Sequence, residues 1–142
     1  MMVTNWHLHP KADIALTTWN SPDVTVNEDG TRTYHLPDAI ATLNPFSRMF
    51  GGTSKLGEVI CAVKFKERQN NNETSGATVV RNGNKDGIWA YRLHTENYWS
   101  PNFDVRSAAL TPIALAIYTP EDWERLQSMG VTLFDGDTMP LA

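Results

Sequence analysis

The sequence predicts an α+β fold: a single domain over residues 1–142, built mainly from an antiparallel meander of strands with two or three short helices. Three observations lead to this prediction. Several segments alternate apolar and polar residues, turn signals separate most of them, and one segment near the C-terminus has clear helix start and stop signals. A chain of 142 residues, 41% of them hydrophobic, is long enough to bury one core.

The first half of the chain is expected to contain a hairpin followed by two short helices. Residues 23–36 alternate around the polar turn 27–30, which indicates the hairpin. Residues 37–52 contain signals for the starts and ends of helices. These signals are Pro37, Asn44, Pro45 and Gly51.

The second half contains the clearest strands. Residues 58–66 alternate with a period of two, which predicts a strand with one face buried, and residues 77–94 read as a second hairpin. Residues 95–111 mix aromatic, charged and proline residues without a period, so we expect a long ordered loop. Residues 112–119 are almost continuously apolar, which favours a strand that is buried on both faces or central in the sheet.

The last predicted helix follows this strand and ends at Gly130. Thr119 suits its N-cap, Pro120 its first position, and Asp122 the acidic position of a capping box. Three apolar residues recur at steps of three and are expected to pack on the sheet. They are Trp123, Leu126 and Met129. Residues 131–134 could add an edge strand.

The composition argues against several classes of function. The formal net charge is -4, and the 12 Lys and Arg residues are dispersed, so we expect no nucleic-acid partner. No apolar run approaches the roughly 20 residues of a membrane-spanning helix, so no membrane contact is expected. Cys61 is the single cysteine and cannot form an intramolecular disulfide, which favours a cytoplasmic protein.

The most informative segment for function is 96–106. Flat aromatic rings are interleaved there with amides, an acid and a guanidinium, a mixture typical of ligand pockets and protein interfaces. The candidate binding residues of the segment are Tyr98, Trp99, Phe103, Asp104 and Arg106. Arg81, Arg92 and His94 on the neighbouring hairpin could face it. They would build a small anion- or nucleotide-sized pocket if Arg92 and His94, two residues apart, share its side. The competing interpretation is a loop that buries its aromatic side chains.

The pair His7 and His9 raises the question of a metal site. Alternating histidines on an extended segment face the same way, but a metal site needs three or four ligands, and no others lie nearby in the sequence. We therefore favour a structural role for both. The alternative is a small metal-dependent hydrolase in which Asp13 or Asp104 adds a carboxylate. Cys61, among apolar residues of a strand, is not expected to be a nucleophile.

Taken together, these features predict a small non-enzymatic intracellular accessory protein that needs no cofactor. We expect it to bind a partner protein or a small anionic ligand through residues 96–106 and the adjacent strands. A homo-oligomer is plausible because an open meander leaves unpaired edges. The size and the lack of catalytic motifs would also suit a phage-encoded protein.

Overall fold

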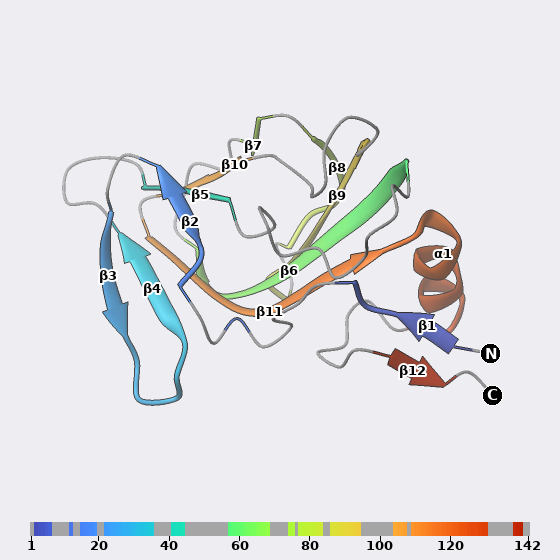
Figure 1. Ribbon diagram of the computed structural model, residues 1–142, viewed down its shortest axis with the longest axis horizontal. Helices are drawn as coiled ribbons and strands as arrows, with labels where there is room; N and C mark the ends of the chain where they lie inside the picture. Colours follow the sequence, from blue (N-terminus) through green and yellow to red (C-terminus); the bar gives the residue numbers. More distant parts are fainter. Residues whose placement is uncertain are drawn as a thin grey trace.

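The computed structural model describes residues 2–6, 12, 15–19, 22–35, 41–44, 57–68, 74–75, 77–83, 86–94, 104–107, 109–130 and 138–140 (Figure 1). Within these ranges most residues lie in strands, and there is one helix. The elements are β1 (Met2–Thr4), β2 (Thr17–Trp19), β3 (Asp23–Val26), β4 (Arg32–His35), β5 (Ala41–Asn44), β6 (Glu58–Arg68), β7 (Thr74–Ser75), β8 (Thr78–Arg81), β9 (Ile88–His94), β10 (Asp104–Ser107), β11 (Ala109–Tyr118), α1 (Pro120–Ser128) and β12 (Thr138–Pro140).

The main sheet has six antiparallel strands in the order β3-β4-β11-β6-β9-β8. The predicted hairpins β3–β4 and β8–β9 are confirmed. The apolar strand β11 is central in the sheet, as predicted, but it begins at Ala109, three residues before the predicted start. The expected meander is only partly formed. Strand β6 pairs with β9 and β11, so β8, which follows β6 among the strands of this sheet, lies outside β9 at the edge.

A second sheet contains four short antiparallel strands in the order β2-β5-β10-β7, and β1 pairs separately with β12. Two sequence-based predictions are wrong here. Residues 41–44 form β5 rather than a helix, and 104–107 and 109–111 are strand rather than loop. Pairing with distant segments, β2 and β10 in the case of β5, overrides the local helix signals. The other predicted helical residues, 37–40 and 45–52, lie outside the described residues.

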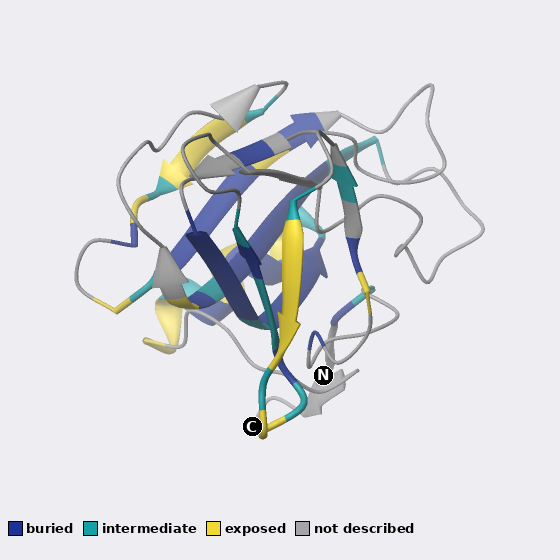
Figure 2. Ribbon diagram, turned by 90° about the vertical axis from the view of Figure 1, so that its left-hand side faces the viewer, coloured by how far each residue is buried: buried dark blue, intermediate teal, exposed yellow. Residues whose placement is uncertain are grey.

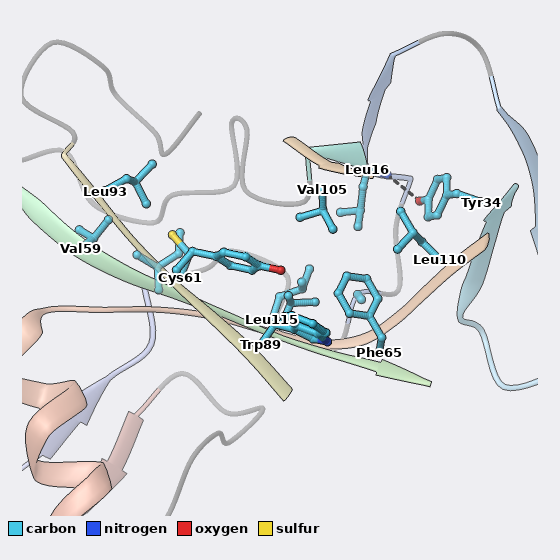
Figure 3. Packing of buried hydrophobic residues seen from close by; sticks show 14 residues of the cluster. Leu16, Tyr34, Val59, Cys61, Phe65, Trp89, Leu93, Val105, Leu110 and Leu115 are labelled. Carbon is cyan, nitrogen blue, oxygen red and sulfur yellow. Dashed lines mark hydrogen bonds between the residues drawn. The ribbon is translucent and has the colours of Figure 1, made fainter. Parts of the chain in front are cut away.

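The larger hydrophobic cluster lies on one face of the main sheet (Figure 3). It combines alternate residues of β6, β9 and β11 with Val105 of β10 and with Leu16, which precedes β2. The phenol oxygen of Tyr34 accepts a hydrogen bond from the backbone N–H of Leu16 at 3.0 Å (Figure 3). The second sheet therefore contributes to the core on this side of the main sheet.

Helix α1 covers part of the opposite face. Trp123 and Leu126 pack there against the buried residues Ile60, Ala62, Ala90, Ala116 and Tyr118. Residues 58–66 thus have both faces covered over part of their length, more than the predicted single buried face, because α1 returns onto the strand.

The signals that start helix α1 act as the sequence predicts. The hydroxyl of Thr119 accepts a hydrogen bond from the backbone N–H of Asp122 at 3.2 Å, and Pro120 is the first helical residue. The prediction that Met129 packs on the sheet is wrong. Its side chain is 46% exposed, because Met129 lies just past the last helical residue. The edge strand expected over 131–134 lies outside the described residues. No described helix is long and apolar enough to cross a membrane.

Candidate binding site

The C-terminal end of the segment 96–106 is held firmly in the fold. Val105 is fully buried in the larger cluster, and β10 is hydrogen-bonded on both sides, to β5 and to β7. Asp104 and Arg106 occupy the strand positions on either side of Val105. Tyr98, Trp99 and Phe103 lie outside the described residues, so the predicted exposure of their rings stays a prediction.

The other end of the segment follows β9. Trp89, Tyr91 and Leu93 of β9 belong to the larger cluster, whereas Ala90 belongs to the cluster under α1. Arg92 shares the alternation of Ala90 and is exposed on that second face. Its Nε lies 3.1 Å from Oε1 of Glu58.

The structure places Arg92 and the buried anchor of the segment on different faces of the main sheet. Arg92 lies on the face of the main sheet that carries α1, and Val105 anchors β10 in the cluster of the opposite face. Residues 95–103 lie outside the described residues, so the expectation that Arg92 faces the aromatic segment stays a prediction. His94 is the Cα partner of Glu58, and its side chain lies outside the described residues.

Arg81, the other arginine of this hairpin, binds groups within the hairpin turn itself. Its guanidinium donates hydrogen bonds to both carboxylate oxygens of Asp86, at 2.9 Å and 2.7 Å. It also donates to the backbone carbonyl of Ile88. The hydrogen bonds from Arg81 lower the pKa of Asp86 to about 2. This arrangement stabilises the turn that the dipeptide Asp86-Gly87 predicts.

Arg32 is a candidate that the sequence analysis missed. It lies on β4, two residues before Tyr34, and is partly buried. Its Nη1 atom is buried, and none of the described residues accepts a hydrogen bond from it. Burial raises the pKa of Tyr34, while the hydrogen bond from Leu16 and the charge of Arg32 act in the opposite direction. The alternation of residues 32–35 could have indicated that Arg32 shares a face with Tyr34.

A buried guanidinium N–H without an acceptor is costly, by roughly 1–3 kcal/mol or more for a charged group. Carboxylate and phosphate oxygens are the acceptors that suit a guanidinium best, because they can accept two parallel hydrogen bonds from it. Among the described residues, Arg32 is thus the cation that has a buried donor atom without a hydrogen-bond acceptor.

The two edges of the main sheet differ in how well they are protected. The described residues with large exposed apolar side chains lie mostly on these edges: Val24, Val26, Val79, Val80 and, on α1's end, Met129. Strand β8 is interrupted by a register shift between Val79 and Arg81, whereas β3 pairs with β4 in unbroken register. A bulge disturbs further pairing, and an unbroken edge strand permits it.

The described part of the chain contains no group of three or more His, Cys, Asp or Glu residues that could hold a metal ion. His7, His9 and Asp13, the residues of the hydrolase alternative, lie outside the described ranges, as does the side chain of Asp104, so that alternative stays a prediction. Cys61 is fully buried, and burial raises the pKa of its thiol, which keeps it protonated.

Comparisons with known proteins add no relative: no family model, curated protein or solved structure matches the chain.

Proposed function

We propose that this protein works by binding rather than by catalysis, and that residues 96–106 form its contact with a partner protein. The observation that supports this is the way the segment is held. Leu93, just before it, and Val105, near its end, are both buried in the larger cluster. A segment fixed at both ends loses less conformational entropy on binding, so more of its contact energy becomes affinity.

The residue types in this segment support a protein partner. Trp, Tyr and Arg are enriched among the residues that dominate binding energies at protein interfaces. Tyr98, Trp99 and Arg106 bring all three types into the span of one short connection. The second sheet, through Val105 in β10, gives this connection a rigid base.

We place this binding inside the cell. Cys61 is the only cysteine of the chain and is buried in the core as a free thiol. A fold of this size without a disulfide obtains its stability from its core alone, which suits a reducing cytoplasm.

Affinity purification from the native cells tests the proposal. The bait carries Trp99→Ala with Arg106→Ala, and the matched control carries Arg92→Ala, an exposed arginine on the face of the main sheet opposite to the cluster that holds Val105. We expect the wild type and the control to retain the same partner and the double variant to lose it, with all three melting at nearly the same temperature. Equal retention by all three proteins, or a double variant that fails to fold, would overturn the proposal.

A second candidate function, the binding of a small anionic ligand, is favoured by Arg32. Its buried Nη1, which has no acceptor among the described residues, would gain one from a carboxylate or phosphate oxygen. Inorganic phosphate is the probe. At ten times its Kd it should stabilise the fold by about 1.4 kcal/mol, which raises the melting temperature by roughly 3–5 °C. The effect should disappear in Arg32→Ala and persist in Arg92→Ala; the same shift in Arg32→Ala excludes this site.

A further inference from the structure

Strand β3 is the outermost strand of the main sheet and is exposed along its whole length, as the strand facing the viewer in Figure 2 shows. Val24 is 48% exposed and Val26 63%. Natural sheets protect such edges with lysine, proline, a bulge or a covering segment. The sequence Asp-Val-Thr-Val of β3 contains neither lysine nor proline, and its pairing with β4 shows no bulge.

The backbone of β3 has a defined set of outward-facing groups. The N–H of Asn27 donates to the carbonyl of Thr31 at 2.8 Å, so this pair is one of the hydrogen-bonded pairs of the hairpin. Because such pairs alternate along antiparallel strands, Thr25 also bonds to β4, whereas the N–H and C=O groups of Val24 and Val26 point away from β4. In the described part of the chain no strand lies on that side to receive them.

We propose that this edge binds a second copy of the same chain, with the two β3 strands antiparallel and Thr25 facing Thr25 of the second copy across a two-fold axis. In this register Val24 of each copy lies opposite Val26 of the other. Both are outward-facing positions, so each Val24–Val26 pair exchanges two hydrogen bonds, and all the outward groups of Val24 and Val26 are satisfied.

The side chains of β3 fit the same register. Val24 has the buried Tyr34 as its Cα partner, so Val24 and Val26 lie on the face of the sheet that carries the larger cluster. A two-fold axis perpendicular to the sheet brings the valines of both copies together on this face and places the two Thr25 side chains together on the other. Val–Val and Thr–Thr are favourable cross-strand pairs. Asp23 lies opposite Asn27 of the second copy, so no like charges face each other.

The opposite edge does not offer the same possibility. Strand β8 shifts register between Val79 and Arg81, and Arg81 is engaged by Asp86 in the hairpin turn. Val79 of β8 is 44% exposed, close to the 48% of Val24 in β3. Both edges therefore expose valine side chains. What distinguishes β3 is its unbroken register with the neighbouring strand. This makes Val79 a suitable control position.

The association should be weak. A pair of four-residue strands buries less than the roughly 1,200 Å² typical of stable complexes, so we expect a reversible dimer with a Kd on the order of 10–100 µM. Sedimentation velocity between about 5 and 500 µM should show the mass rising from 15.9 kDa toward twice that value. Val26→Lys should stay monomeric at every concentration, and Val79→Lys should associate like the wild type.

Cysteine cross-linking tests the register itself. In a non-hydrogen-bonded pair two Thr25 Cα atoms lie about 4.5 Å apart, within the range of a disulfide. Two Val24 Cα atoms in the same dimer are separated by roughly 8 Å, which is too far. Mild oxidation should therefore link Thr25→Cys at least ten times faster than Val24→Cys or Val79→Cys. Cys61 is fully buried and does not compete.

Three results would overturn the inference. The first is a wild type that is still monomeric at about 500 µM. The others are a dimer that Val79→Lys disrupts and Val26→Lys does not, and equal cross-linking of Thr25→Cys and Val24→Cys. Circular dichroism of each variant confirms that it is folded. The inference is independent of the partner contact proposed for residues 96–106, because none of these measurements uses that segment.

Discussion

The replacement Leu126→Ala measures how much the packing of α1 contributes to the stability of the fold. Leu126 is fully buried and belongs to the smaller cluster, between the helix and the main sheet. Its truncation removes three carbon atoms from the core, which at about 0.8 kcal/mol per carbon costs about 2.4 kcal/mol. Three of the sheet residues in this cluster are Ala62, Ala90 and Ala116, whose short side chains cannot fill the cavity. The cavity adds a further penalty, so we expect a total loss of about 3–4 kcal/mol.

Urea unfolding followed by tryptophan fluorescence and circular dichroism measures this loss, provided that the two signals give the same transition. Met129→Ala is the matched control. The three-residue spacing of the sequence places Met129 on the same stripe as Leu126, whereas the structure leaves it 46% exposed. We therefore expect Met129→Ala to change the free energy of unfolding by less than about 0.5 kcal/mol. A loss below about 1 kcal/mol for Leu126→Ala, or equal losses for both variants, would refute the packing described for α1.

Three further changes test local features of the fold by the same unfolding measurement. Gly87→Ala should cost about 2–4 kcal/mol, because the residue has a φ of +78° and a Cβ would lie 2.6 Å from the carbonyl oxygen of Phe65. Thr119→Ala removes the acceptor at the start of α1 and should cost about 1 kcal/mol. Asp86, whose pKa is lowered from 3.8 to about 2 by Arg81, stabilises the fold above pH 4 or so and loses this contribution as the pH falls toward 2. Because the pair is partly exposed, with side chains 25% and 41% accessible, the difference between wild type and Asp86→Asn should shrink by only about 0.5–1 kcal/mol between pH 6 and pH 2.5.

The predictions from sequence succeeded where local signals and the final contacts agree. The hairpin over 23–36 combines alternation with a polar turn, and α1 combines a cap, a first-position proline and a terminating glycine. They failed at β5 and β10, where the local pattern favours a helix or no regular structure. These two strands exist because they pair with each other, across more than 60 residues of chain, and no local pattern encodes such a partner.

Strand order was the second limit. Alternation in 58–66 and in 77–94 identified strands but did not indicate that β11 would insert beside β6. The same missing information affects the candidate site. Residues 92 and 94 were expected on one side of their strand, as alternation requires, but which side that is depends on where α1 and the second sheet pack. Arg92 therefore meets Glu58 on the helix face, away from the anchor of the aromatic segment at Val105.

The two edge strands show how a small difference in sequence decides what a sheet can do. Both β3 and β8 are short, exposed and rich in valine. In β8 one additional residue between Val79 and Arg81 breaks the alternation of backbone hydrogen-bonding groups. In β3 the alternation continues through Thr25, so the outward groups of Val24 and Val26 keep the spacing that another antiparallel strand requires. Inserting one glycine between Thr25 and Val26 should therefore abolish self-association as effectively as Val26→Lys without adding charge; a dimer that survives this insertion would show that side chains, not backbone pairing, hold it together.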